Sequence, residues 1–261
     1  MKAHALTRAT GVAGDYMLSL GALIGLIALW WLVSHMGWIG KVFLPTPEAA
    51  FQSLFSGLSS PDGLGPATWA TVQRMLLGWL MASVAGIAIG AVIGASALAR
   101  TYIQPILELI RPLPASAVMP FAISAFGLNP SMVLFVVAFG AVWPVLLATA
   151  NGIASVDPQL KELSACLRLN RTAFLWKVGL PNATSDILAG MRLSLTVALI
   201  VSIVGEMLAS QPGLGQAILF AARSFQSSDL FAGVMLLGGI GFFSNVLLAL
   251  VERRLLRWRA I

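Results

Sequence analysis

The chain has 261 residues, of which 58% are apolar and only 10% are charged, with a mean hydropathy of +0.89. A soluble domain carries about a quarter charged residues, so this composition excludes a water-soluble globular fold and favours a bilayer as the solvent. The single cysteine, Cys166, excludes an internal disulfide and any multi-cysteine metal cluster. The net charge of +6 would suit a nucleic-acid partner, but the distribution of the basic residues provides a different explanation.

Six apolar segments follow one another along the chain, and each is long enough to span a bilayer as a helix. They are predicted at Tyr16–Met36, Met75–Leu98, Ile103–Phe126, Ser131–Asn151, Ser185–Leu208 and Leu230–Val251. The first segment is too long for the core of a signal peptide and is interpreted as retained. The expected fold is therefore an all-α membrane protein with six transmembrane helices.

The basic residues predict the orientation of these helices. With the N-terminus inside, the cytoplasmic side receives Lys2, Arg8, Arg100, Lys161, Arg168, Arg171, Lys177, Arg253, Arg254, Arg257 and Arg259. Only Lys41 and Arg223 fall outside. This asymmetry follows the positive-inside rule and removes the need for a nucleic-acid partner. The predicted organisation is a cytoplasmic segment at 1–15, one transmembrane domain at 16–252 and a basic cytoplasmic tail at 253–261.

Two of the predicted segments have unusual compositions. Gly86, Gly90 and Gly94 repeat every four residues on the second segment, which lets another helix approach closely. That neighbour is expected within the same subunit, with a dimer face as the alternative. The third segment contains four prolines, at positions 105, 112, 114 and 120, which kink or break a helix. Such a helix either lines a transport pathway or packs as a kinked element.

The loop at 156–181 is predicted to form two short cytoplasmic helices. Asp157 caps the first, with Pro158 in its first position, and Leu160, Leu163 and Leu167 form one apolar stripe. Asn170 caps the second, Arg171–Val178, which is expected to stop at Gly179 and Pro181. An exposed apolar stripe needs a docking surface, and the membrane interface, the protein's own helix ends and a partner protein all remain open.

Several stretches together resemble a known family. Glu162-Leu163-Ser164, Leu167-Arg168 and Leu180-Pro181 resemble the "EAA…G…LP" loop of permeases in binding-protein-dependent ABC importers. Arg111-Pro112-Leu113-Pro114 resembles an "RPxP" element, and Phe126-Gly127 a "WFG" element, of the branch that includes nitrate, sulfonate and taurine importers. Glu206-Met207-Leu208 with Gly213-Leu214-Gly215 is similar to the "AEML…SGLG" stretch of that branch.

The resemblance implies a type I importer permease that acts as a homodimer. It also implies two cytoplasmic ATP-binding-cassette ATPase subunits, a periplasmic or lipid-anchored binding protein, and location in a bacterial inner membrane. The residues implied to couple to the ATPase are Glu162, Leu163, Ser164, Leu167, Arg168 and Leu169. Arg168 stands where the family has glycine, and Asn170 is expected to take over the left-handed turn.

The candidates for a pathway or gate are Arg74, Arg111, Glu206, Gly213 and Gly215. Charges inside a membrane should face protein or water. Arg74 and Arg111 would attract an anionic solute, Glu108 is expected to pair with Arg111, and charges near segment ends can simply reach the interface. The outer segment at 211–226 is expected to be either a re-entrant gate or an interfacial helix. Its predicted apolar face comprises Ile218, Leu219, Ala222 and Phe225.

The sequence shows no site for chemistry of its own. It has no phosphate-binding loop of the G-x-x-x-x-G-K-[ST] type and no nucleophile with an adjacent base. ATP and magnesium are therefore expected on a partner ATPase, with no cofactor in this chain. The rival class is an intramembrane enzyme or a channel that acts without ATP.

Overall fold

The computed structural model describes the backbone of residues 2–256 and the side chains of residue 18 and residues 20–256. Within that range the chain is helical and has no strand. The elements are α1 (Lys2–His35), α2 (Pro47–Ser59), α3 (Leu64–Ala95), α4 (Ala97–Ile110), α5 (Ala115–Phe126), α6 (Pro130–Ala154), α7 (Pro158–Cys166), α8 (Arg171–Phe174), the π-helix η1 (Leu175–Gly179), α9 (Leu180–Ala209), α10 (Leu214–Arg223) and α11 (Ser227–Leu255).

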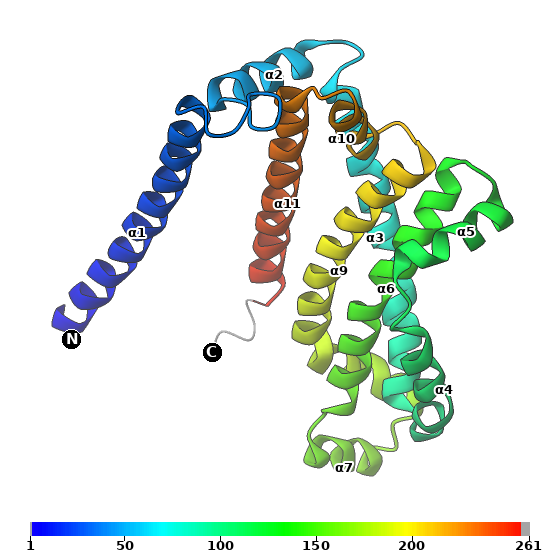
Figure 1. The fold of residues 1–261 in the computed structure, drawn as a ribbon. Helices are drawn as coiled ribbons and strands as arrows, with labels where there is room; N and C mark the ends of the chain where they lie inside the picture. The colour runs from blue at the N-terminus through cyan, green and yellow to red at the C-terminus, as the bar shows by residue number, and fades with distance from the viewer. Residues whose placement is uncertain (1, 257–261) are drawn as a thin grey trace.

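Three long helices, α3, α6 and α9, pack against one another and form the centre of the bundle (Figure 1). Their shared core consists of small and branched side chains, among them Ala82, Val133, Val137 and Ala198. α5 contributes Met119 to the same cluster. α1 leans away from this bundle, and its described side chains are mostly exposed (Figure 1).

The glycine repeat of α3 lies against α6. A Cβ atom at Gly86 would lie 2.9 Å from the Val145 Cβ, and one at Gly90 would lie 2.5 Å from the Leu146 carbonyl oxygen. The backbones approach too closely for any side chain at these positions. The expected role of the repeat in packing within one subunit is therefore confirmed.

Four helical stretches are long and apolar enough to cross a membrane: Leu64–Ala95, Pro130–Ala154, Arg171–Ala209 and Ser227–Leu255. α4 and α5 meet the same criteria only as a pair, which is bent by 93° and would be a fifth span. The described apolar part of α1 is Leu20–His35. The side chain of Tyr16, where the first predicted segment begins, lies outside the described residues.

Two predicted segments need correction. α3 begins at Leu64 rather than at Met75, so Arg74 lies inside a helix instead of at its end. The polar start of α3 is compatible with a helix because a hydroxyl such as that of Thr68 donates to the Leu64 carbonyl at 2.6 Å. The third segment is two helices, because Pro112 and Pro114 lack the N–H groups that a continuous helix requires.

The end of α1 is attached to the rest of the protein by tryptophans. Trp30 donates to the Pro45 carbonyl at 3.0 Å and stacks on Phe231 of α11, and Trp31 donates to the Glu48 carboxylate at 2.9 Å. A hydrogen bond from its own backbone N–H holds the pKa of the Glu48 carboxyl below its usual range, and the bond from Trp31 acts in the same direction. These contacts fix the junction of α1 and α2.

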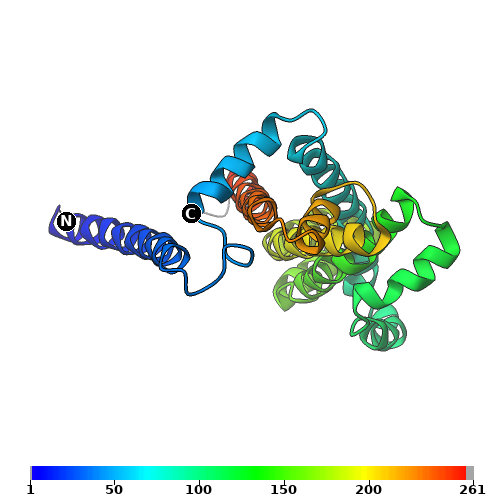
Figure 2. The same ribbon diagram turned by 45° about the horizontal axis from the view of Figure 1, so that its top comes forward.

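The two candidate functional regions lie at opposite ends of the long helices. α2 runs across one end of the bundle and contacts α11 there, close to α10 (Figure 2). α7 projects from the other end, beyond α6 (Figure 1). The bundle of α3, α6 and α9 is the connection between these ends.

The close packing of α3 on α6 predicts different effects for two substitutions of glycine by alanine. Gly90→Ala should lower the stability of the detergent-solubilised protein by about 1–3 kcal/mol, because the added methyl overpacks the contact with α6. Gly25→Ala should be neutral or slightly stabilising, since nothing lies within 4 Å of that position and alanine favours the helix. Thermal unfolding of both variants measures the difference, and equal midpoints would contradict the packing.

Candidate functional site

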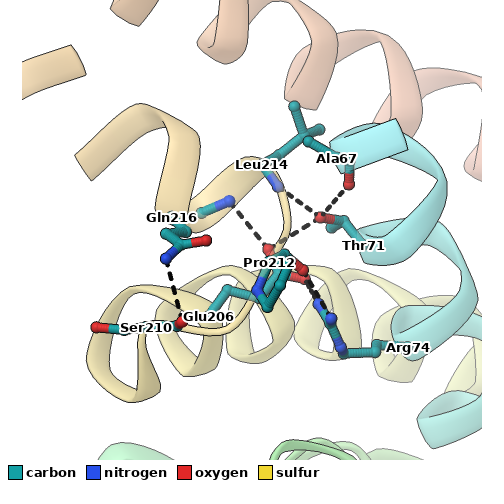
Figure 3. A network of polar contacts seen from close by, with 9 residues as sticks. Ala67, Thr71, Arg74, Glu206, Ser210, Pro212, Leu214 and Gln216 are labelled. Atoms are coloured by element: carbon teal, nitrogen blue, oxygen red, sulfur yellow. Dashed lines mark hydrogen bonds and ion pairs between the residues drawn. The ribbon is translucent and has the colours of Figure 1, made fainter. Parts of the chain in front are cut away.

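Among the residues whose side chains the structure describes, one carboxylate is completely buried, that of Glu206 near the end of α9. Its Oε1 accepts a hydrogen bond from Arg74 Nη1 of α3 at 2.6 Å, which makes an ion pair. Its Oε2 accepts from the Thr71 hydroxyl and from the Gly215 backbone N–H, both at 2.9 Å. Both oxygens are thus satisfied, as a buried charge requires (Figure 3).

Arg74 and Thr71 extend this network to the turn between α9 and α10. Arg74 Nη2 donates to the Pro212 carbonyl at 2.6 Å, and the Leu214 N–H donates to the Thr71 hydroxyl at 2.9 Å (Figure 3). The first N–H groups of α10 are therefore bonded by side chains of α3 and α9, since the N-cap residue Gly213 has no side chain to supply. We call Thr71, Arg74, Glu206 and the turn 210–215 the carboxylate network.

The turn needs its glycines because the carboxylate network leaves no space. A Cβ atom at Gly213 would lie 2.3 Å from the Glu206 Oε2, and one at Gly215 would lie 2.4 Å from the Ile203 carbonyl oxygen. Ser210 ends α9 in the left-handed conformation, with a φ of 51°. The Gln216 amide donates to the Ser210 carbonyl at 3.1 Å and closes the turn from the other side.

The predicted apolar face of the outer segment is wrong in part. α10 buries Leu214, Ile218 and Ala221, whereas Ala222 and Phe225 are exposed. The hydrogen bonds from Leu214 and Gly215 fix the rotation of α10 about its axis, and this places a different stripe against α3, α9 and α11.

Four of the five predicted pathway or gate residues meet in the carboxylate network: Arg74, Glu206, Gly213 and Gly215. The fifth, Arg111, lies exposed at the bend between α4 and α5. Its predicted pairing with Glu108 is wrong, because Glu108 accepts a hydrogen bond from Gln104 at 2.8 Å and no ion pair forms between them. The sequence analysis did not identify Thr71 as a member of this site. The sequence signal for it is its position three residues before Arg74, which places both residues on one face of a helix.

The expectation that Arg74 and Glu206 simply reach the interface is also wrong. Only 12% of the Arg74 side chain is exposed, and its guanidinium is held by Glu206 and Pro212, so it is poorly placed to attract an anion. Arg192 forms an ion pair with Glu252 of α11 that is more accessible, with 43% and 24% of the two side chains exposed. A buried pair and a half-exposed pair thus fasten α9 to α3 and to α11.

The predicted helix of loop 156–181 is present as α7. Asp157 accepts a hydrogen bond from the Gln159 N–H at 2.7 Å, and Pro158 occupies the first turn, which confirms the predicted cap. Leu163 and Leu167 are 55% and 64% exposed, so the leucine stripe has no partner among the residues that the structure describes. Of the predicted coupling residues, Ser164 is buried and donates to the Leu160 carbonyl, while Glu162, Leu163, Leu167 and Arg168 are exposed and Leu169 is half-buried.

The turn after α7 differs from the expectation. Arg168 itself adopts the left-handed conformation, with a φ of 48°, whereas Asn170 has a φ of −70°. Asn170 instead caps α8 and accepts from the Ala173 N–H at 2.7 Å, as predicted. Arginine in this conformation is strained, since an L side chain rarely adopts it.

The second loop helix does not stop at Gly179 and Pro181. α8, η1 and α9 continue one into the next, and Arg171–Ala209 is a single helical stretch. A proline ring clashes with the carbonyl four residues earlier in an α-helix, and the wider π-turn at Leu175–Gly179 accommodates Pro181. The loop is therefore joined rigidly to α9.

Two contacts that the sequence did not indicate fasten α7 and the start of α9 to the end of α6. Lys161 Nζ donates to the Ala154 carbonyl at 3.0 Å, and Asn182 donates to the Gly152 carbonyl at 3.2 Å. Both satisfy carbonyl groups at the C-terminal end of α6, where a helix leaves them without partners. Among the residues that the structure describes, no three histidine, cysteine, aspartate or glutamate side chains are grouped to hold a metal ion.

An apolar helical bundle with a broken membrane helix, a buried ionic network at one end and a projecting capped helix at the other defines a membrane permease. Residues 75–257 match the family described as the binding-protein-dependent transport system inner membrane component. The chain belongs to this family and is a permease component of an ABC importer.

Relatives and solved structures agree with this assignment. The chain is 32% identical over 234 residues to an aliphatic sulfonates transport permease protein of Bacillus subtilis, covering 90% of this chain and 84% of the relative. It is 30% identical over 246 residues to the taurine transport system permease protein of Escherichia coli, covering 92% and 89%. An inward-facing structure of the MetNI methionine ABC transporter has the same fold, with a TM-score of 0.61 at 17% identity, covering 74% of this chain and 94% of that chain.

The burial of Glu206 predicts that breaking its ion pair costs more than removing both partners. Arg74→Met should destabilise the protein by about 3–5 kcal/mol, because it leaves a buried carboxylate without its cation. The double variant Arg74→Met/Glu206→Met should recover a large part of that loss. Glu252→Gln, in the more exposed pair, should cost no more than about 1 kcal/mol. Chemical denaturation of these variants, of Glu206→Met and of the wild type measures the differences, and a double variant no more stable than Arg74→Met would contradict the coupling.

Proposed function

We propose that this chain, paired with a second copy of itself, forms the pathway of an importer that moves a small anion from periplasm to cytoplasm. Two cytoplasmic ATPase subunits bind ATP and magnesium and hydrolyse ATP, while this chain is non-catalytic and holds no cofactor. A periplasmic or lipid-anchored binding protein delivers the solute. Both termini lie in the cytoplasm, and α2 and α10 lie on the periplasmic side.

The observation that carries this proposal is the exposed leucine stripe of α7. α7 is a capped helix that projects from the end of the bundle opposite the carboxylate network (Figure 1). Leu163 and Leu167 have no partner in the described chain, and apolar anchors of this kind dominate small docking sites. A docking ATPase covers them in the proposed complex.

The contacts of α7 provide a route for motion. Lys161 fastens α7 to the end of α6, and the continuous helix through η1 joins the same loop to α9. α6 and α9 pack on α3, and α3 and α9 hold the carboxylate network at the outer end. A movement of α7 on ATP binding is therefore transmitted to the turn before α10. Alternating access is then a population shift between inward- and outward-facing states, driven by the different affinities of the two states for ATP.

The broken pair α4–α5 supports a pathway between two copies. α4 has no buried residue in the isolated chain, and the charged side chains of Glu108 and Arg111 are exposed on this pair. Charges at membrane depth are costly against lipid, so they should face water or protein. A second copy placed against this side encloses them in a shared aqueous route.

A small anion is the solute that best fits this route. Arg111 forms no ion pair within the described residues and is exposed at the bend, where broken helices commonly contact a transported group. The relatives named for aliphatic sulfonates and taurine act on compounds that carry a sulfonate group. The proposed solute is therefore an anion of the size of nitrate, taurine or a small sulfonate.

The first test concerns α7. Leu163→Asp should abolish stable binding of the ATPase, because it places a charge against an apolar groove, and solute-stimulated ATP hydrolysis should disappear. Glu162→Ala should weaken binding less, since a charge at the rim of an interface contributes less than a desolvated anchor. Co-purification and ATP hydrolysis in proteoliposomes measure both effects.

The control for that test is membrane insertion, which Leu163→Asp should leave intact because the residue lies outside the spanning helices. If the variant protein still purifies with stoichiometric ATPase and still couples hydrolysis to uptake, α7 is not the coupling element. An enzyme or channel that acts without ATP would not bring down an ATPase in the wild-type form either.

The second test concerns orientation. Cys166 is exposed on α7 and should not react with a membrane-impermeant thiol reagent in intact cells, because it faces the cytoplasm. In a Cys166→Ser background, Ser60→Cys at the other end should react readily. Permeabilised cells provide the control, in which both positions should be labelled. Labelling of Cys166 from outside intact cells would reverse the proposed topology and exclude a cytoplasmic ATPase at α7.

A further inference from the structure

A cavity lies beside the carboxylate network, at the same end of the bundle. Its volume is about 810 Å³. Five parts of the chain form its walls: α2, the loop into α3, the start of α3, the turn before α10 with α10 itself, and the start of α11. Because the lining residues at 53–67 and those at 212–229 are far apart in the sequence, the cavity exists only in the folded protein.

The charged side chains that line the cavity are acidic. Asp62 and Asp229 both line it, and its lining contains no lysine or arginine. Asp229 accepts a hydrogen bond from the Ser53 hydroxyl. Asp62 is exposed and forms no hydrogen bond or ion pair with the other described residues. At least one carboxylate therefore faces the cavity without a partner.

Apolar side chains stand beside these carboxylates. Phe220 lines the cavity with 67% of its surface exposed, and Leu64, Pro66 and Ala217 are further apolar lining residues. A site with apolar walls and an acidic group suits a side chain with an aliphatic stem and a cationic head. Lysine and arginine have this form, because they cover apolar surface with their stems while the charge reaches a polar partner.

The same charges argue against the cavity as a route for an anion. A negative solute would meet two carboxylates and no basic group there. The carboxylates repel an anion at the entrance of the cavity. The same carboxylates attract and steer a positively charged partner. An acidic cavity on the outer face of an anion importer is therefore better suited to a protein than to the solute.

We propose that this cavity is the docking socket for the substrate-binding protein, which inserts a lysine or arginine side chain between Asp62 and Asp229. This inference rests on the proposed function, in which such a protein docks at the periplasmic end. The partner's chemistry is specified by the cavity: a basic side chain at the centre of its contact surface, with apolar neighbours against Phe220.

The socket shares a wall with the carboxylate network. Pro212 and Gly213 line the cavity, and the same two residues accept a hydrogen bond from Arg74 and pack on the Glu206 carboxylate, respectively. An inserted side chain therefore touches the turn that joins α9 to α10. Docking of the binding protein therefore acts on the carboxylate network through direct contact.

The test uses the permease–ATPase complex in proteoliposomes, with the binding protein that stimulates ATP hydrolysis by the wild-type complex. Asp62→Asn/Asp229→Asn should raise the binding-protein concentration for half-maximal stimulation about tenfold, with the maximal rate unchanged within twofold. The dependence of that concentration on salt should become weaker, because an ion pair has been removed.

Glu48→Gln is the control for the loss of a negative charge at this end of the protein. Glu48 also lies on the outer end but outside the cavity lining, and the change removes the same charge. It should shift the half-maximal concentration less than twofold. Basal ATP hydrolysis and co-purification of the ATPase should be normal in every variant, since both aspartates are exposed and away from α7.

A charge reversal identifies the partner residue. Asp62→Lys/Asp229→Lys should fail with the wild-type binding protein and recover with one variant in which a single lysine or arginine is changed to glutamate. A half-maximal concentration within twofold of wild type in the double asparagine variant would overturn the inference. So would a lower maximal rate at an unchanged half-maximal concentration, which would make the cavity part of the solute route.

The outcome that would contradict the proposed function differs from those that overturn the socket. If no binding protein stimulates ATP hydrolysis by the wild-type complex, this chain is not the permease of a binding-protein-dependent importer of the proposed kind. The proposed docking socket is then wrong as well. Stimulation of the wild type with unaffected aspartate variants overturns the socket alone.

Discussion

The buried carboxylate of Glu206 places a strong constraint on the half of the molecule that contains α10. A carboxylate without access to water needs a cation and several hydrogen-bond donors within contact distance. Arg74 and Thr71 of α3 and the Gly215 N–H of α10 supply them. The positions of α3, α9 and α10 relative to one another are thereby fixed by one group, and the glycines of the turn follow from the space that this group takes.

The bundle of α3, α6 and α9 is a single packed unit, because glycines let the backbones of these helices approach closely. The glycines of α3 face α6, and Gly190 of α9 lies so close to α6 that its Cβ would be 2.6 Å from the Ala148 Cβ. Interiors packed this closely transmit displacement rather than absorb it. α7 is fastened to α6 at the far end, so three closely packed helices connect the two ends of the molecule.

The parts of the chain outside this unit are those that an assembly would cover. α1 diverges from the bundle, α4 buries none of its side chains, and the leucines of α7 face outward. Each therefore points to a different environment: lipid or a second copy for α1, a shared aqueous route for α4, and an ATPase for α7 under the proposed function.

The sequence alone indicated a membrane protein of several helices, because bilayer-length apolar segments, the asymmetry of basic residues and the helix caps of loop 156–181 are local or compositional signals. The permease family came from the resemblance of its motifs, which the family match bears out. The sequence also identified Arg74, Glu206, Gly213 and Gly215 as candidates, but only the tertiary structure showed that they form one network with Thr71. Hydrogen bonds between residues 71 and 206 depend on how α3 packs on α9, which no periodicity encodes. For the same reason the sequence misplaced the apolar face of α10, whose rotation is fixed by bonds to α3 and α9, and assigned the left-handed turn to Asn170 instead of Arg168. Local chemistry decides which residues can form a helix, a cap or a charge pair, and the packing of distant helices decides which of them do.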